Sequence, residues 1–246
     1  MSQPLEMSMD DRWAIYIDIE GFSALYPDGN NALWALNRLM QAIHKIGKNV
    51  FPEPPDRLFA HQLGDGFLIV SEFHEDDLDR AVSIATLLMK FTSSFGVFAR
   101  GTIAEGGLSG ITGCYSEEVM DDCQDGNWST SSMGAGLMTI FPVMGTALIN
   151  AVGIDKRSPK GPLLTMPSKY KSRISESFLT KDVPGNEIIS LDWVHTELEF
   201  DIAAKALLEY PSPDNLEDFV RNYVNKHELP TEWKDSCSLY LGVNYA

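Results

Sequence analysis

The sequence has few cysteines and none at metal-binding spacing. Its three cysteines, Cys114, Cys123 and Cys237, are odd in number and form no C-x-x-C pair, which argues against a disulfide framework. We therefore expect reduced thiols and a cytoplasmic protein. The first residues, Met1 to Asp11, contain neither a basic region nor an apolar stretch, so no signal peptide is expected.

Basic residues are also scarce. The chain of 246 residues carries 19 lysines and arginines against 35 acidic residues, a net charge of -16. This excess of acid argues against a general nucleic-acid-binding surface, so an anionic substrate would need metal ions or a local basic cluster. One such cluster exists, because Lys156 to Arg173 contains six basic residues and no acid. It predicts either a locally positive rim or an ordinary solvated face.

Long hydrophobic runs are missing as well. Residues 126–154 contain no charged residue, but they include Asn127, Pro142, Asn150 and several Ser, Thr and Gly residues. That stretch is too polar for a membrane span. We expect an apolar helix at 137–154, buried or facing another subunit, and no association with a membrane.

Two short stretches indicate chemistry. Trp13 to Ile17 is apolar, with β-branched and aromatic residues, and predicts a buried strand that leads to Asp18 and the turn residue Gly21. Leu58 to Ser71 predicts a hairpin with Asp65 at its tip, between two glycines. Carboxylates beside glycine turns suit hard cations and the phosphates they carry, so the two are predicted to hold metal ions over a nucleoside triphosphate. Each alone could instead be an ordinary turn or capping residue.

The remaining pattern predicts an α+β fold. Helical periodicity at 31–48 and from about 79, then a strand at 97–108, gives the order strand, helix, hairpin, helix, strand, with helices on one face of a sheet. Residues 109–136 are expected to be loop-like. Further strands are expected at 161–166 and 187–191, and further helices at 168–178, 198–210 and 215–227.

The motif Asp18-Ile19-Glu20-Gly21-Phe22-Ser23, followed by Gly64-Asp65, resembles the catalytic domain of class III nucleotidyl cyclases. Arg100-Gly101, Gly106 and Gly145 to Leu148 are similar to later elements of that family. The resemblance covers about residues 10–191. It implies a ferredoxin-like βαββαβ core as a domain at 1–195, with a C-terminal helical extension at 196–246 packed on the core or the dimer.

Several roles follow from this resemblance. Asp18 and Asp65 would ligate two Mg²⁺ or Mn²⁺ ions, with the Ile19 carbonyl as a further ligand, and the amides of Gly21 to Ser23 would bind the β- and γ-phosphates. Lys181 is similar to a late lysine that meets the terminal phosphates, or is simply solvated. The family forms 3′,5′-cyclic nucleotides and pyrophosphate. It works as dimers in which one chain completes the other's metal site, so a homodimer is implied.

The base-reading positions depart from the family. His61 stands where its purine cyclases carry a lysine, and Pro142 replaces the companion acid. His61 and Phe59 would line the base pocket instead, unless they are an ordinary sheet histidine and a core residue. The chain thus looks like the stand-alone pyrimidine (uridylate or cytidylate) cyclases of bacterial antiphage (Pycsar) signalling. That likeness implies UTP or CTP as substrate, and a separate effector activated by cyclic UMP or cyclic CMP.

The transition-state positions depart as well. The Asn and Arg of the family would fall at Ile149 and Gly153, so Asn150 and Arg157 are the candidates for those catalytic roles. Two alternatives stay open. One is an adenylate or guanylate cyclase with an atypical base pocket, and the other is a degenerate cyclase-homology module that binds without chemistry. Two retained carboxylates that repel one another without metal argue against the second alternative.

Overall fold

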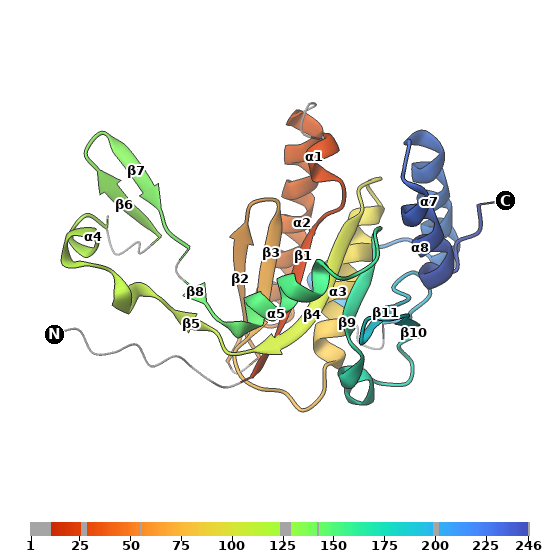
Figure 1. Ribbon diagram of the computed structural model, residues 1–246, viewed down its shortest axis with the longest axis horizontal. Helices are drawn as coiled ribbons and strands as arrows, with labels where there is room; N and C mark the ends of the chain where they lie inside the picture. Colours follow the sequence, from red (N-terminus) through yellow and green to blue (C-terminus); the bar gives the residue numbers. More distant parts are fainter. Residues whose placement is uncertain are drawn as a thin grey trace.

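A seven-stranded sheet forms the centre of the molecule (Figure 1). The computed structural model describes residues 11–25, 29–54, 56–123, 129–141, 143–198 and 202–245. The strands of the sheet are β1 Arg12–Ile19, β2 Leu58–Leu63, β3 Gly66–Ser71, β4 Ala99–Gly106, β9 Leu164–Pro167, β10 Thr180–Val183 and β11 Ile188–Leu191. They lie in the order β10-β11-β9-β4-β1-β3-β2. β4 and β9 pair in parallel, and β1 is antiparallel to both of its neighbours, β3 and β4.

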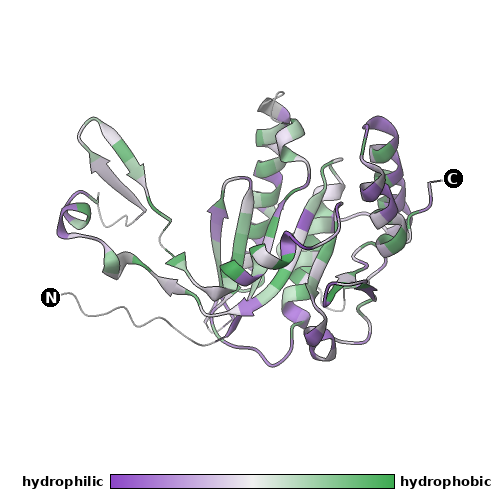
Figure 2. Cartoon of the chain, in the orientation of Figure 1, coloured by the Kyte–Doolittle hydropathy of each residue, from purple (hydrophilic) through white to green (hydrophobic). Residues whose placement is uncertain are grey.

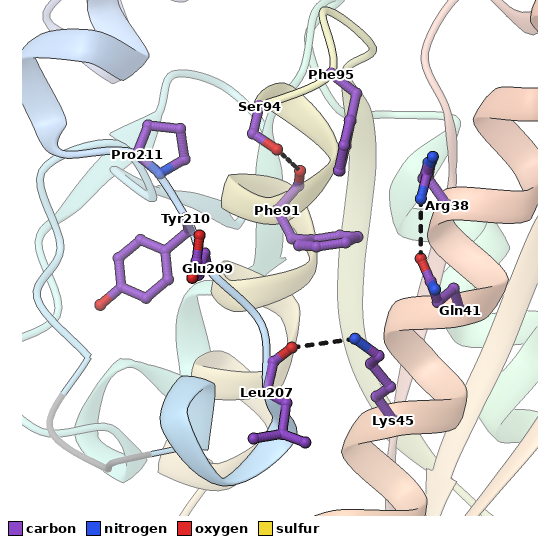
Figure 3. Close-up of a pocket in the computed structure, with 10 residues that line it drawn as sticks. All are labelled: Arg38, Gln41, Lys45, Phe91, Ser94, Phe95, Leu207, Glu209, Tyr210 and Pro211. Carbon is purple, nitrogen blue, oxygen red and sulfur yellow. Dashed lines mark hydrogen bonds between the residues drawn. The ribbon is translucent and has the colours of Figure 1, made fainter.

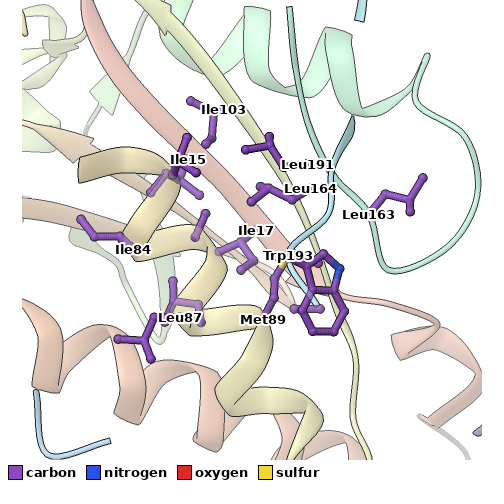
Figure 4. Close-up of a cluster of buried hydrophobic side chains, with 14 of the residues drawn as sticks. Ile15, Ile17, Ile84, Leu87, Met89, Ile103, Leu163, Leu164, Leu191 and Trp193 are labelled. Atoms are coloured by element: carbon purple, nitrogen blue, oxygen red, sulfur yellow. The ribbon is translucent and has the colours of Figure 1, made fainter. Parts of the chain in front are cut away.

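The main core lies between one face of this sheet and two helices, α2 (Gly29–Asn49) and α3 (Asp79–Ser93). Figure 4 shows Ile15 and Ile17 of β1 close to Ile84 and Leu87 of α3, and all four are fully buried. Ile15 and Ile17 belong to the apolar run that predicted a buried strand, and Ile84 is one of the apolar positions at helical spacing. The expected order strand, helix, hairpin, helix, strand is therefore present over residues 12–106.

The opposite face of the sheet carries one helix, α5 (Thr146–Asp155) (Figure 1). A second and smaller apolar cluster lies between this face and α5, and it consists of Ala14, Leu68, Val70, Leu108 and Ala147. Ala14 alternates with the main-core residues of β1, because successive side chains of a strand point to opposite faces. The α+β class is thus confirmed. The expectation of helices on one face holds for α2 and α3 and is wrong for α5.

The described residues between 107 and 145 leave the sheet as an arm (Figure 1). Its described elements are β5 Ser109–Gly110, η1 Thr112–Cys114, α4 Glu117–Asp121, β6 Thr130–Met133, β7 Gly136–Thr139 and β8 Val143–Met144. The prediction of one helix over 137–154 is wrong in its first half, where β7 pairs with β6 around a turn at Gly134. The described part of the region expected to be loop-like, 109–136, likewise contains two short helices and two strands, β5 and β6.

The C-terminal region contains three helices instead of the expected two. The described helices after β11 are α6 Ile202–Ala206, α7 Pro213–Lys226 and α8 Thr231–Leu241. Ile202, Leu216 and Trp233 join the main core, so this region packs on the rest of the chain. The boundary at residue 195 stays a prediction.

Two short helices complete the described elements, α1 Phe22–Leu25 and the 3₁₀ helix η3 Ser168–Arg173. None of the helices in the described ranges combines the length and the apolar character that a bilayer crossing requires.

Candidate functional site

Asp18 and Asp65 lie at the same corner of the sheet. Asp18 is directly opposite Arg100 on β4, so both side chains point to the face that carries α5. Asp65 is in the two-residue turn between β2 and β3. The next residue, Gly66, would place an added Cβ 3.0 Å from the Asp18 Cβ and 3.0 Å from the Ile17 carbonyl. A glycine there therefore lets the hairpin tip lie against Asp18.

The carboxylate of Asp18 is held in an unfavourable electrostatic environment. Burial raises its pKa to about 7, and the negative charges of Asp155 and Asp65 add to the increase, while Arg100 lowers it. The Tyr16 hydroxyl donates to Asp18 Oδ2 at 3.4 Å, and burial together with the Asp18 charge raises the pKa of Tyr16, which keeps this donor protonated. A cation at this corner would relieve the repulsion.

Arg100 does not supply that cation, because its guanidinium is already paired. Arg100 Nε donates to Asp155 Oδ1 at 2.5 Å, and its other nitrogens donate to the carbonyls of Asp155 and Pro159 at 2.7 Å each. Arg100 thereby binds the C-terminal end of α5. Sequence analysis missed Asp155, although a carboxylate at a helix C-terminus is unfavourable without a partner and was a usable signal.

The oxygen atoms at the corner fit a hard divalent cation. Two carboxylates and the Ile19 carbonyl are oxygen donors of the kind that Mg²⁺ and Mn²⁺ prefer. Within the described ranges, no three His, Cys, Asp or Glu side chains form a group that could hold a metal ion. An ion bound here would therefore complete its ligand set with water or with phosphate oxygens of a substrate, as Mg²⁺ commonly does.

The turn after β1 presents its backbone beside this corner. Gly21 has a φ of +72°, the left-handed conformation that favours glycine. Gly21 and Ser23 are exposed and Phe22 is half-buried. Phosphate binding by these amides stays a prediction.

The two predicted base-pocket residues share one face of β2, the edge strand. His61 is opposite Leu68, and Phe59 is opposite Val70, so both lie on the α5 side of the sheet. The His61 ring is edge-on to Phe141, with centroids 5.6 Å apart. Burial lowers the pKa of His61, which favours a neutral ring at pH 7. Pro142, expected near this pocket, lies outside the described residues.

The two predicted transition-state residues line one cavity of about 780 Å³ between α5 and residues 167–170. Asn150 Nδ2 donates to the Glu105 carbonyl at 2.8 Å, and Arg157 Nε donates to the Gly153 carbonyl at 3.1 Å. Lys169, from the predicted basic cluster, lines the same cavity. Asp18 and Asp65 do not, so within one chain the acidic corner and this cavity are separate.

Lys181 lines neither the acidic corner nor this cavity. It is on β10, at the opposite edge of the sheet from β2, and its ammonium donates to the Leu239 carbonyl at 2.9 Å. The structure does not bring it to the acidic corner of the same chain. Its predicted role at the terminal phosphates stays a prediction.

A second cavity, of about 600 Å³, lies among α2, α3 and residues 207–211 (Figure 3). Lys45 crosses part of it to donate to the Leu207 carbonyl at 3.1 Å. The cavity is on the main-core side of the sheet, and none of the predicted site residues lines it. The predicted site residues of β1, β2 and α5 thus lie on the α5 side, away from this cavity.

The sequence matches no known protein family and no curated protein. Among solved structures, the chain is similar to the non-canonical dimeric guanylyl cyclase domain of the RhoGC fusion protein from the aquatic fungus Blastocladiella emersonii. The TM-score is 0.51 at 14% identity, over 74% of this chain and 96% of that domain. This likeness shows that the chain has the fold of a nucleotide cyclase domain. The chemistry rests on the residues of the site.

Proposed function

We propose that the chain is a metal-dependent nucleotide cyclase that converts UTP or CTP to the 3′,5′-cyclic nucleotide and pyrophosphate. One observation carries the proposal: in a cyclase-domain fold, two carboxylates meet beside a glycine turn, and one of them has a pKa raised to about 7 by burial and by its acidic neighbours. Repulsion between carboxylates does not stabilise a fold. It is explained if a metal ion with a bound triphosphate neutralises these charges.

Different residues of this corner would bind the metal ions and the phosphates. Asp18 and Asp65 would hold two Mg²⁺ or Mn²⁺ ions with the Ile19 carbonyl, and the amides of Gly21 to Ser23 would bind the β- and γ-phosphates. The metal ions would lower the pKa of the ribose 3′-hydroxyl and neutralise charge on the triphosphate. Tyr16 keeps one Asp18 oxygen oriented through its hydroxyl.

The preference for a pyrimidine is proposed from the base-pocket residues. A neutral His61 ring, edge-on to Phe141, supplies one donor, one acceptor and no charge. Phe59 presents a ring on the same face, 37% exposed, for stacking. The antiphage role and the effector that responds to cyclic UMP or cyclic CMP rest on the sequence resemblance.

A homodimer would bring the acidic corner of one chain to the α5 cavity of the other. Large apolar side chains lie open on the arm and on α5: Met133 (58% exposed), Leu137 (59%), Met144 (52%) and Ile149 (68%). Figure 2 shows the hydrophobic colour on the β7 strand of the arm. A two-stranded hairpin is marginally stable alone, and an exposed apolar surface of this kind is typical of a protein interface.

The first experiment is incubation of the purified protein with ATP, GTP, CTP and UTP, separately, with Mn²⁺, and separation of the products by chromatography. We expect a cyclic pyrimidine nucleotide that Asp65→Ala abolishes. The matched control is Asp182→Ala, at a carboxylate that is 76% exposed on β10 and should leave turnover unchanged. Cyclic AMP or cyclic GMP would refute the pyrimidine preference, and no product from a confirmed dimer would favour the non-catalytic module.

Subunit complementation tests the shared site. Asp65→Ala and Arg157→Ala would each be inactive, because each removes one half of every active site. In an equal mixture that exchanges subunits, heterodimers keep one intact site, so activity should return to about a quarter of the parent value. A mixture that stays inactive after subunit exchange would contradict a site shared between chains.

A further inference from the structure

The C-terminal helices reach the turn that follows Asp18. Trp233 Nε1, on α8, donates to Glu20 Oε1 at 3.2 Å across 213 positions of sequence. The Tyr223 hydroxyl, on α7, lies over Gly21, because a Cβ added to Gly21 would be 3.8 Å from that oxygen. Two helices from the far end of the chain therefore contact the two residues that connect β1 to α1.

These contacts come from a fixed group of aromatic rings. The Tyr223 ring is edge-on to Phe98, with centroids 4.9 Å apart, and is tilted toward Trp233 at 5.8 Å. Phe98 and Trp233 are 1% and 3% exposed. The Phe98 carbonyl also accepts the Glu20 amide at 2.8 Å. Buried rings with few rotamers form a rigid support, and here they surround the turn from two sides.

The other contacts of the turn are few and partly exposed. α1 is four residues long and has no fully buried residue, although Phe22 and Leu25 are half-buried and pack against the main core. The described backbone contacts of the turn are the Glu20 amide to Phe98 and the Ala24 amide to the Gly21 carbonyl at 2.9 Å. The side-chain contacts from α7 and α8 add to these contacts at Glu20 and Gly21.

We propose that Trp233 and Tyr223 are positioning residues that hold Glu20 and Gly21, and thereby set the direction of the amides from Gly21 to Ser23. The nature of the ligand at these amides, a nucleoside triphosphate, rests on the function proposed above. The positioning itself rests on the contacts. The C-terminal helices then belong to the support of the active site and are not a separate accessory unit.

Hydrogen exchange in the ligand-free protein tests the positioning without any need for turnover. The amides of Glu20 and Ala24 are hydrogen-bonded and report the turn. Trp233→Phe removes the indole donor, and Tyr223→Phe removes the hydroxyl and keeps the ring. We expect residues 18–25 to exchange about fivefold faster in Trp233→Phe, as for loss of one hydrogen bond, and also faster in Tyr223→Phe, which loses the hydroxyl that lies over Gly21. Trp34→Phe and Tyr210→Phe make the same changes elsewhere and should leave this exchange as in the parent.

Unchanged exchange at 18–25 in both variants would overturn the proposal. Exchange that increases there only together with α7 and α8 would overturn it as well, because the residues would then serve packing alone. If Trp233→Phe fails to fold, Tyr223→Phe still decides, since it keeps every ring contact.

Kinetics separate this proposal from the proposed function. With a triphosphate and Mn²⁺, KM should rise about tenfold in Tyr223→Phe at an unchanged unfolding temperature, because displaced amides bind phosphate less well. Faster exchange in the variants, with no turnover even in the parent, would sustain the positioning and remove the proposed function. Normal turnover, with exchange and KM both unchanged in the variants, would support the proposed function and refute the positioning role.

Discussion

On one face of β1, Trp13, Ile15 and Ile17 are fully buried in the main core beneath α2 and α3. On the other face, Tyr16 and Asp18 alternate with them and stay half-buried, with charged neighbours. One strand thus carries two kinds of side chain at a period of two. The main-core face contains apolar contacts, whereas the α5 face contains carboxylates, hydroxyls and a paired arginine.

The difference suggests that the two faces meet opposite requirements. Apolar burial on the main-core face supplies stability. The α5 face gives up some of that stability, because half-buried carboxylates near one another repel unless a ligand neutralises them. Substitutions at neighbouring positions of the same sheet can test whether the two faces differ in this way.

The largest loss of stability is expected on the α5 face, against the simple division in which only the main-core face stabilises the fold. Arg100 lies on the α5 face, yet its loss should destabilise the fold, because Arg100→Met leaves the Asp155 carboxylate unpaired and removes bonds to three carbonyls. We expect a loss of about 4 kcal/mol in the free energy of unfolding, measured by urea titration. Arg157→Met, at an exposed arginine, is the control. A loss below about 1 kcal/mol would mean that the pair is dispensable.

Ile17→Ala should give the next largest change, on the main-core face. Ile17 is fully buried, so truncation leaves a cavity and should lower the free energy of unfolding by about 3 kcal/mol. The folded fraction should still bind Mn²⁺ as the parent does, because Asp18 points to the other face. Isothermal titration with Mn²⁺ checks this, and a lost metal response in folded protein would show that the two faces are coupled.

Asp18→Asn, at the neighbouring position, should act in the opposite direction. The folded pKa of about 7 exceeds the unfolded value near 4, so ionised Asp18 opposes folding increasingly as the pH rises from 4 to 7. Without divalent ions, the variant should gain about 2 kcal/mol at pH 8 and little at pH 4 in denaturant titrations. Adding Mn²⁺ should stabilise the parent alone. A variant less stable than the parent at pH 8 would make Asp18 a structural residue.

The features that could be predicted from the sequence are those set by residues close together in the chain. The apolar run in β1, the periodicity of α2 and the glycines around Asp65 are signals within a few residues, and they predicted the buried strand, the helix and the hairpin that places Asp65 near Asp18. The pairing follows from register: Ile17 is opposite Phe67, which brings Asp18 to the hairpin tip.

Long-range contacts could not be predicted in the same way. The Arg100 pair with Asp155 joins positions 55 apart, and the Trp233 bond to Glu20 joins positions 213 apart. The helix expected at 137–154 was misassigned because its uncharged sequence suits a helix or a strand equally, and Gly134 and Gly136, just before it, favour the hairpin. No local signal placed Lys181 at the far edge of the sheet.

His195 provides the smallest effect and a test of whether a polar cluster can serve stability alone. Its Nδ1 faces Asp192 Oδ2 at 2.9 Å and its Nε2 faces Glu217 Oε1 at 2.9 Å, so a protonated ring joins the end of β11 to α7. Arg221 also pairs with Glu217 and Asp218, and Gly242 packs against the ring. Burial by itself lowers the pKa of His195, but Glu217 and Asp192 outweigh it and raise the pKa.

A raised folded pKa means that this stabilisation is complete below the unfolded pKa of about 6.5 and is lost as pH rises through the folded value. His195→Gln should therefore lower the free energy of unfolding by about 1 kcal/mol at pH 6 and by less at pH 9, in paired denaturant titrations. His44→Gln, at an exposed histidine of α2, should show no such difference between the two pH values. A deficit that stays constant or grows with pH would contradict the charged bridge. With the expected result, the charged cluster around His195 would be shown to stabilise the fold. The two kinds of polar site would then differ in their electrostatics: opposite charges attract around His195, whereas like charges repel around Asp18, as expected for a site that binds a cation.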